Sequence, residues 1–340
     1  MLHVVAGAVF DGEGRVLIAL RPAHAHQGGK WEFPGGKLDD GEAPLTGLVR
    51  ELDEETGVRV QSARPLIRIH WPYPGRHVLL DVWRVTAWSG RAHGREGQEI
   101  RWADPVSLDA AAFPPANAAI IAALRLPPLY LVTPEPKPPY PDFLERLEAL
   151  VRAGVRMVQL RAKSMAPADF VTLARRAQAI CHAGGARLLV NADAATALAC
   201  GADGLHLTSA RLHEYARRPV PDRMLLAASC HDAAQVDRAA ALECDFVVAG
   251  PVAPTISHPG MAPIGMDGFG AIALRAGRPV YALGGMQAED LPAVWRAGGQ
   301  GIAAISALWL ARSPQVAVQA CLAVAQWSIS ADSVSPPRGQ

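Results

Sequence analysis

The stretch Gly36-Lys-Leu-Asp-Asp-Gly-Glu-Ala-Pro-Leu-Thr-Gly-Leu-Val-Arg-Glu-Leu-Asp-Glu-Glu-Thr-Gly-Val58 decides the fold of the first part of this chain. Pro44 suits the first turn of a helix, where its missing N–H is no loss, and Gly57 suits the left-handed residue that ends one. Apolar side chains recur between them at spacings of three and four residues, at Leu45, Leu48, Val49 and Leu52. The pattern predicts a helix with one buried stripe.

The polar face of this helix is acidic. Glu51, Glu54 and Glu55 stand at i, i+3 and i+4, so three carboxylates crowd one face within a turn. Three glutamates alone are also the pattern of a solvated helix face. Arg50 compensates part of the charge, and a hard divalent cation such as Mg²⁺ prefers oxygen ligands of this kind.

The spacing across the whole stretch resembles the box of the Nudix hydrolases. That box reads Gly, five residues, Glu, seven residues, Arg-Glu-aliphatic, one residue, Glu-Glu, one residue and Gly-aliphatic. Its fixed positions are filled here by Gly36, Glu42, Arg50, Glu51, Leu52, Glu54, Glu55, Gly57 and Val58. The resemblance implies a loop–helix–loop that holds Mg²⁺, or Mn²⁺, against a nucleoside diphosphate linkage and hydrolyses it.

Runs of β-like residues surround the helix. Strands are expected over 4–10, 15–20, 65–71, 78–88 and 98–103, with the first two joined as a hairpin by Asp11-Gly12-Glu13-Gly14. A short helix is expected over 118–124, with Asn117 as its N-cap. The Pro-rich link Pro127-Pro128 then closes a first domain of residues 1–128. We expect an α+β Nudix fold, an α/β/α sandwich with a mixed sheet.

Residues 3–126 resemble one branch of that family, the MutT-type 8-oxo-dGTP diphosphatases that cleanse the nucleotide pool in support of DNA replication and repair. The matching pieces are Arg21, the run 32–37, Arg76-His77, the run 96–98 and the run 113–117. By position, the resemblance implies that Glu51, Glu54, Glu55 and the carbonyl of Gly36 hold the metal. It implies that Glu96 is a further metal ligand or the general base. Arg21 would contact the phosphates, and the base pocket would contain Phe33, Arg76 and Asn117.

Each of these residues also has a plain structural interpretation. Without the resemblance, Asn117 is a helix cap and Phe33 a core aromatic residue. Arg76 is a solvated turn residue and Glu96 a loop charge.

Length and composition limit the number of domains, the partners and the location that can be expected. At 340 residues the chain suggests two domains. A net charge of +1 without a run of Lys or Arg excludes a basic footprint for nucleic acid. The first residues lack the pattern of a signal peptide, and no apolar run reaches the length of a membrane span. Five cysteines without metal-ligand spacing fit a reducing compartment, so a cytoplasmic location is expected.

The second half alternates short apolar runs with helical patterns. Strands are expected over 129–133, 157–161, 188–191, 204–207, 225–229, 246–250, 280–284 and 301–306. Helices are expected over 142–152, 167–182, 232–243, 266–275, 289–296 and 314–327. Eight strands that are apolar throughout, with helices between them, predict a (β/α)8 TIM barrel over residues 129–327 with its site where the strands end. The Ser/Pro-rich residues 328–340 are expected to form a disordered tail.

Residues 129–327 resemble the thiamine phosphate synthases and the TenI-like thiazole tautomerases. The resemblance rests on Gln159-Leu-Arg161-Ala-Lys163, Asn191, the runs 201–207 and 229–231, the run 250–257, Gly284-Gly285 and Ser306. It implies a thiazole phosphate held by Thr255, Ser257, Gly285 and Ser306. A pyrimidine diphosphate would lie against Gln159, Arg161 and Lys163.

Three positions depart from the synthase pattern. Ala192 and Arg211 stand where synthases have Mg²⁺-binding aspartates, and His258 stands where they have a lysine. Asp193 could replace the first aspartate only if its loop shifts. The departures imply weak or absent coupling, whereas tautomerase chemistry needs only proton transfer, for which His231 is the candidate acid/base. A histidine that merely packs at a strand end is the alternative.

The function expected first is Mg²⁺-dependent hydrolysis of 8-oxo-dGTP to 8-oxo-dGMP and diphosphate, with a small-molecule nucleoside triphosphate as the partner. An alternative is that the Nudix site hydrolyses damaged or unwanted diphosphates of the thiamine pathway. The barrel is then either a tautomerase or a non-catalytic ligand-binding module.

Overall fold

The computed structural model describes residues 1–23, 26–73, 75–255, 260 and 262–333. It divides into two compact units, one made of residues 1–126 and 326–340 and the other of residues 127–325. The chain therefore passes from the first unit to the second at residue 126 and returns at residue 326. The sequence places these boundaries at 128 and 327.

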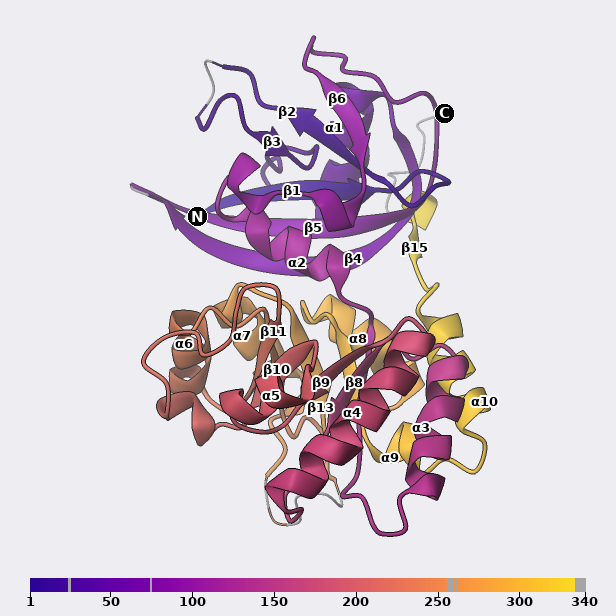
Figure 1. Ribbon diagram of the computed structural model, residues 1–340. Coiled ribbons are helices and arrows are strands. Elements are labelled where there is room, and N and C mark those ends of the chain that lie inside the picture. Colours follow the sequence, from indigo (N-terminus) through magenta and orange to yellow (C-terminus); the bar gives the residue numbers. More distant parts are fainter. Residues whose placement is uncertain (24–25, 74, 256–259, 261, 334–340) are drawn as a thin grey trace. The chain divides into compact units, whose positions relative to one another are not determined.

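The first unit is built on a mixed four-stranded sheet (Figure 1). Its strands run in the order β1 (Leu2–Val9), β5 (Arg76–Ser89), β4 (Arg59–Tyr73) and β15 (Ile329–Ser330). Strand β1 lies parallel to β5, and the other two pairs are antiparallel. A second sheet of three strands has the order β3 (Trp31–Glu32), β2 (Val16–Leu20) and β6 (Ile100–Ala103).

One helix covers each face of the larger sheet. Helix α1 (Pro44–Thr56) packs Leu45, Leu48 and Leu52 onto one face, and helix α2 (Asn117–Arg125) packs Ile120 and Ile121 onto the other. Alternate residues of β1 serve the two cores, because successive side chains of a strand point to opposite faces. The expected α/β/α sandwich with a mixed sheet is confirmed. Short 3₁₀ helices η1 (Pro105–Ser107), η2 (Ala110–Ala112) and η5 (Ala331–Ser333) complete the unit.

The second unit is a closed barrel of eight parallel strands with helices around it (Figure 1). The strands are β7 (Leu129–Val132), β8 (Met157–Leu160), β9 (Arg187–Val190), β10 (Gly204–Leu207), β11 (Leu225–Cys230), β12 (Phe246–Ala249), β13 (Val280–Leu283) and β14 (Gly301–Ala304). Nearly every one of these strand residues is buried. This architecture confirms the predicted TIM barrel.

Most barrel helices lie between consecutive strands in the chain, and the last two follow β14. The barrel helices are α3 (Pro141–Arg152), α4 (Pro167–Ala183), α5 (Ala194–Cys200), α6 (Ala233–Ala241), α7 (Gly265–Ala276), α8 (Leu291–Arg296), α9 (Ser306–Trp309) and α10 (Pro314–Val324), with 3₁₀ turns η3 (Arg211–His213) and η4 (Ala288–Asp290). In the described residues, no helix combines the length and apolar character that a bilayer crossing needs.

Two local expectations are wrong, and a third is right only in part. The expected hairpin turn over residues 11–14 is present, since Phe10 and Val16 form an antiparallel bridge and the Asp11 amide donates to the Arg15 carbonyl at 3.0 Å, but β1 and β2 belong to different sheets. Asn117 is not a helix cap: the N-cap of α2 is Ala116, and the Asn117 side chain is buried. The tail, expected to be disordered from residue 328, is ordered up to Ser333, because β15 pairs with β4 and η5 follows it.

Candidate active sites

Helix α1 carries the acidic cluster of the first unit, and its two ends are fixed as the sequence predicts. Pro44 occupies the first turn, and Gly57 ends the helix with φ of 67°. The buried leucine stripe turns the opposite face, with Glu51 and Glu54, away from the core. The Glu54 side chain is 61% exposed and that of Glu51 only 14%.

Arg50 links the carboxylates of this face. Its Nη1 donates to Glu51 at 2.8 Å and to Glu54 at 3.3 Å. Its Nε and Nη2 donate to the two oxygens of Glu42, at 3.0 and 2.8 Å, so the Arg50–Glu42 pair is bidentate. These hydrogen bonds raise the pKa of Arg50, with those to Glu42 the largest cause, and the pKa of the Glu42 carboxyl is lowered in turn. The partial compensation predicted for Arg50 is therefore present, and Glu42 is the residue that anchors it.

Glu55 lies deeper than its neighbours. The pKa of Glu55 is raised to about 7, chiefly by burial and also by the negative charges of Glu32, Glu51 and Glu96. A hydrogen bond from the Gly35 amide at 3.0 Å acts in the opposite direction. A partly buried carboxyl group surrounded by like charges favours the arrival of a cation. The structure thus brings Glu96, on the exposed loop after β5, within electrostatic range of Glu55.

Gly36 lies against Glu51. A methyl group added at Gly36 would stand 2.2 Å from Glu51 Oε2, so any side chain here would displace the carboxylate. The Gly36 carbonyl accepts the Val5 amide at 2.9 Å, and its second lone pair remains a possible metal ligand.

The oxygen donors expected for Mg²⁺ are therefore gathered at one end of α1, and they fit a hard cation. As arranged in the described part of the chain, no three His, Cys, Asp or Glu side chains converge in ligand positions. Arg50 accounts for this at Glu51 and Glu54, since its guanidinium is bound to both.

A cavity of about 410 Å³ runs from this end of α1 across the sheet. At the α1 end it is lined by Gly35, Gly36 and Glu55, and farther along by Arg21, Phe33, Arg76 and Asn117. All four predicted substrate residues thus face one cavity. Phe33 stacks on Phe113 with ring centroids 5.7 Å apart, so it is both a core aromatic residue and a cavity wall.

The cavity wall also contains residues that were not expected from the sequence. Glu32 holds Arg21 through a short ion pair with Nη1, and Trp71 and Tyr73 extend the aromatic wall. Tyr73 also lies beneath Arg76, whose guanidinium carbon is 5.9 Å from the ring centroid. The available signal was the period-two spacing of Ile69, Trp71 and Tyr73 on one strand face.

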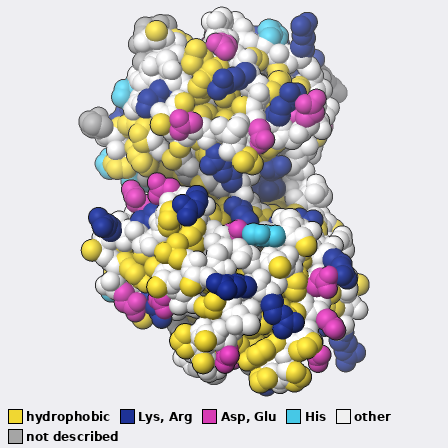
Figure 2. Space-filling model, in the orientation of Figure 1, with side chains coloured by type: hydrophobic (Ala, Val, Ile, Leu, Met, Phe, Trp, Pro, Cys, Tyr) yellow, Lys and Arg dark blue, Asp and Glu magenta, His cyan; other side chains and the backbone are white. Residues whose placement is uncertain are grey.

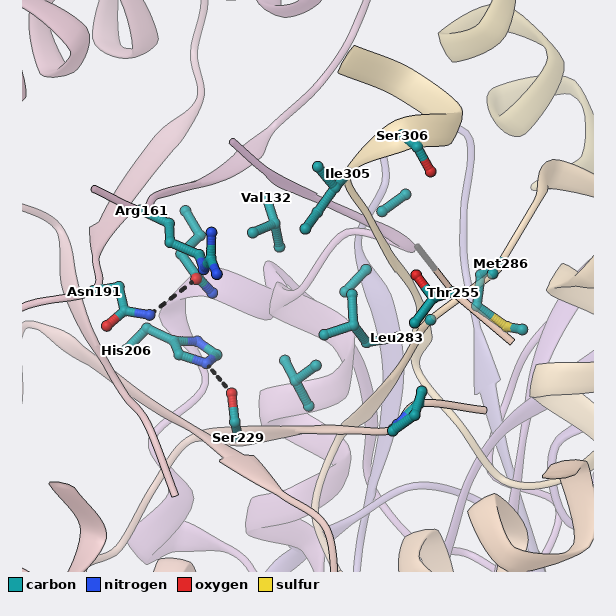
Figure 3. Close-up of a pocket in the computed structure, with 18 of the residues that line it drawn as sticks. Val132, Arg161, Asn191, His206, Ser229, Thr255, Leu283, Met286, Ile305 and Ser306 are labelled. Atoms are coloured by element: carbon teal, nitrogen blue, oxygen red, sulfur yellow. Dashed lines mark hydrogen bonds between the residues drawn. The ribbon is translucent and has the colours of Figure 1, made fainter. Parts of the chain in front are cut away.

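The second site is a cavity of about 180 Å³ at the carboxyl ends of the barrel strands. Figure 3 shows two polar groups of side chains with apolar Val132, Leu283 and Ile305 between them. Arg161, Asn191, His206 and Ser229 form one group, and Thr255 and Ser306 belong to the other. The predicted Gln159, Arg161, Lys163, Thr255, Gly285, Ser306 and His231 all line this cavity. Ser257 and His258 lie outside the described residues.

A hydrogen-bonded network that was not predicted lies under the first group. Tyr130 Oη meets Gln159 Nε2 at 3.3 Å and His206 Nδ1 at 3.2 Å, and His206 Nε2 meets Ser229 Oγ at 2.9 Å. Asn191 Nδ2 donates to Gln159 Oε1 at 3.5 Å. Burial lowers the pKa of His206 to about 3, so its imidazole is neutral and its two nitrogens are fixed by their partners.

His231 is oriented by the backbone. Its Nδ1 lies 2.5 Å from the carbonyl oxygen of Gly250, which can only accept, so Nδ1 carries the proton. In the neutral ring Nε2 is then the basic nitrogen, as a proton-transfer role requires. Asp193 caps α5 by accepting the Thr196 amide at 2.8 Å and is not among the residues that line the cavity.

The described residues on the face in view carry surface charges of both signs. Lys and Arg side chains alternate there with Asp and Glu side chains on each unit (Figure 2). Mixed signs of this kind differ from the basic stripe of a nucleic-acid-binding surface.

Comparison with known proteins agrees with both halves. Residues 5–123 match the family model described as NUDIX domain, and residues 129–308 match the model described as thiamine monophosphate synthase. The 8-oxo-dGTP diphosphatase of Escherichia coli is 40% identical over 124 residues, which cover 36% of this chain and 96% of that protein. That of Proteus vulgaris is 43% identical over 96 residues, covering 28% of this chain and 86% of the relative. The thiamine-phosphate synthase of Gloeobacter violaceus is 34% identical over 195 residues, covering 57% of this chain and 55% of that protein.

Proposed function

This chain belongs to the NUDIX domain family through residues 5–123 and to the thiamine monophosphate synthase family through residues 129–308, and from this premise we propose that its first domain, a Nudix hydrolase, converts 8-oxo-dGTP to 8-oxo-dGMP and diphosphate. The observation that carries the proposal is the single cavity that joins Glu55 and Gly36 to Phe33 and Asn117. A phosphate chain and a base can therefore be held together in it.

The acidic end would hold the metal. Glu51, Glu54, Glu55 and the Gly36 carbonyl are its proposed ligands, with Mn²⁺ as a substitute for Mg²⁺. Such an ion neutralises phosphate charge and lowers the pKa of a bound water. For Glu51 and Glu54 to bind it, Arg50 Nη1 must leave both carboxylates while its Nε and Nη2 keep Glu42. Glu96 is the proposed fourth carboxylate, either as a ligand or as the base that takes the proton of the attacking water.

The other end would recognise the nucleotide. Arg21, whose Nη1 pairs with Glu32, would bind phosphate oxygens with its remaining N–H groups. The Asn117 amide can give both a donor and an acceptor to the edge of an oxidised guanine. Phe33 and the cation of Arg76 would contact the faces of the base.

A substrate panel on the full chain tests the assignment. Diphosphate release should be fastest from 8-oxo-dGTP, slower from dGTP, and dependent on Mg²⁺. Glu51→Gln and Glu54→Gln should each lose most of it, whereas Asp40→Asn, an exposed carboxylate of the same loop–helix segment, should not. Near-normal turnover in either glutamine variant would refute the ligand assignment.

The same panel addresses the alternative substrate class. If the first domain acts on diphosphates of the thiamine pathway, thiamine diphosphate analogues should be hydrolysed faster than 8-oxo-dGTP. An Asn117→Ala variant that hydrolyses 8-oxo-dGTP at the wild-type rate would also favour that alternative.

For the barrel we propose binding of a thiamine-precursor phosphate with little or no coupling activity. Support comes from the two polar groups of the cavity and from Ala192 and Arg211 at the positions where the synthase pattern has aspartates. The fixed Nδ1 of His231 favours proton transfer as the remaining chemistry. Solvent isotope exchange into a thiazole carboxylate phosphate should occur in the wild type and stop in His231→Ala. Absence of exchange in both would leave a ligand-binding module.

A further inference from the structure

Two exposed histidines face each other across the β4–β5 hairpin of the first unit. His77 Nδ1 lies 3.2 Å from His70 Nε2, and the two imidazoles are nearly parallel, with centroids 5.2 Å apart and an interplanar angle of 13°. Both side chains are exposed. One ring must therefore donate and the other accept, which requires at least one neutral imidazole.

The pair lies on the sheet face opposite the nucleotide cavity. His70 is directly opposite Leu79, and His77 precedes Leu79 by two residues, so both histidines point to the same face. The side chains of the pairs Trp71–Val78 and Tyr73–Arg76 point to the other face of the sheet, where they line the cavity. The two histidines are thus separate from the acidic end of α1 in both position and chemistry.

The spacing of the two nitrogens suits a shared metal ion. Zinc–imidazole bonds of about 2.0–2.1 Å that meet at a tetrahedral angle place the two nitrogens about 3.4 Å apart. The observed 3.2 Å is close to this value, so an ion could replace the shared proton after small ring rotations. Imidazole nitrogen suits Zn²⁺, Cu²⁺ and Ni²⁺, whereas Mg²⁺ prefers oxygen.

We propose that His70 and His77 form a two-imidazole site for a transition-metal ion such as Zn²⁺, distinct from the Mg²⁺ site of the hydrolase. Among the residues that the structure describes, no third His, Cys, Asp or Glu side chain joins them in a metal cluster, so water completes the coordination. The site does not depend on which substrate the first domain hydrolyses.

Metal binding there would fix the tip of the hairpin. Beyond the pair, the register continues with Pro72 opposite His77 and Tyr73 opposite Arg76. An ion that joins the two strands restrains this pairing, and with it the cavity wall on the other face. The expected signs are added thermal stability of the first unit and slower hydrogen exchange at the tip.

Zinc titration of the full chain in saturating Mg²⁺ tests the site. Calorimetry of the wild type should show one binding event that His70→Gln and His77→Gln each weaken by at least about tenfold, since loss of even a supporting residue commonly costs that much. Three controls should bind as the wild type does: His93→Gln, an exposed imidazole whose Nδ1 meets the Arg91 carbonyl, His3→Gln and Asp40→Asn.

A second measurement separates binding from damage to the fold. In chelator, all variants should unfold at the temperature of the wild type, and added Zn²⁺ should raise that temperature only where both histidines are present. Equal zinc affinity in the wild type and in the His70→Gln, His77→Gln double variant would overturn the proposal. So would a thermal shift that persists in the double variant.

Discussion

Arg50 acts as a built-in cation at the acidic site. Its guanidinium is hydrogen-bonded to Glu42, Glu51 and Glu54, so it compensates part of the negative charge on this face of α1. Under the proposed ligand assignment, metal binding would be an exchange of partners at Glu51 and Glu54, and its cost would depend on how firmly Glu42 retains the arginine. Charge-assisted hydrogen bonds of this kind are strong.

Glu42→Gln should weaken that retention and raise the Mg²⁺ concentration needed for half-maximal activity. Without the bidentate partner, Arg50 competes more strongly for Glu51 and Glu54. A charge-assisted hydrogen bond contributes about 1.5–3 kcal/mol, so a shift of roughly tenfold is expected. Diphosphate release measured against Mg²⁺ concentration gives the value, with Asp40→Asn as the charge control. An unchanged Mg²⁺ requirement in Glu42→Gln would contradict this role of Glu42.

His206 makes the barrel sensitive to acid. Burial lowers its folded-state pKa to about 3, while the pKa of an unfolded histidine is about 6.5. Below pH 6.5 the unfolded chain gains a proton that the folded barrel does not, so stability is lost as the pH falls through this window. By pH 5 the loss should reach about 2 kcal/mol relative to neutral pH and above, and it should be absent in His206→Gln. The free energy of unfolding of the barrel is measured at each pH by urea unfolding, with hydrogen exchange in the peptide that contains β11 as the readout. If this free energy falls with pH equally in the wild type and in His206→Gln, His206 is not the cause.

At the scale of elements, the end of α1 shows how one backbone position supports the site. Gly57 has φ of 67°, and its amide donates to the Asp53 carbonyl at 3.0 Å. An added Cβ would approach His93 Cε1 to 2.9 Å and the Arg91 carbonyl to 3.1 Å. The residues after β5 therefore pack directly on the helix end, next to the loop that carries Glu96.

Gly57→Ala should destabilise the first unit by more than the strain of a left-handed residue alone. That strain is about 1–2 kcal/mol for an L-residue, and the two close contacts add to it. Gly14→Ala is the matched control, because Gly14 has φ of 79° and nothing within 4 Å of an added Cβ. Thermal unfolding of both variants compares the two costs. Equal shifts would mean that the contacts at Gly57 relax freely.

Elements were predictable from sequence where one kind of packing acts along their whole length. The barrel strands are apolar throughout because both faces are buried, and β8 and β10 begin at the predicted Met157 and Gly204. Helix α5 was missed because only Ala197 and Cys200 are buried in its seven residues. Strand β4 extends far beyond the predicted 65–71, since its ends are polar and partly exposed and are ordered by pairing with β5.

Site residues followed the same rule. The acidic face of α1 could be predicted because its members lie within one helix, where spacing fixes position. Tyr130, His206 and Ser229 come from three different strands, and only the barrel closure brings them together. Asn117 was interpreted as a cap because caps are read locally, whereas its burial depends on the cavity across the sheet.

For the whole molecule, the order of the chain matters as much as its two folds. The segment from Gln326 returns to the first unit after the barrel is complete. There Ile329 pairs with Ala63 and Ser330 with Ser62, Ile329 packs into the core beneath α1, and Ala331 is buried. The first unit is therefore finished by residues that follow the barrel, and the barrel is tethered to it at both ends.

Removal of residues 328–340 should thus destabilise the hydrolase unit and leave the barrel intact. The unit would lose the apolar contacts of Ile329 and Ala331 together with the hydrogen bonds at the edge of β4, which should cost about 1–3 kcal/mol. Hydrogen exchange during thermal unfolding should show earlier opening of α1 and β4 and unchanged opening of β11. Ile329→Ala, which keeps the strand backbone, separates the two contributions and should show a smaller shift of the same sign. If α1 is as well protected from hydrogen exchange in the truncated chain as in the full chain, β15 does not stabilise the sheet. The hydrolase domain would then end at residue 126.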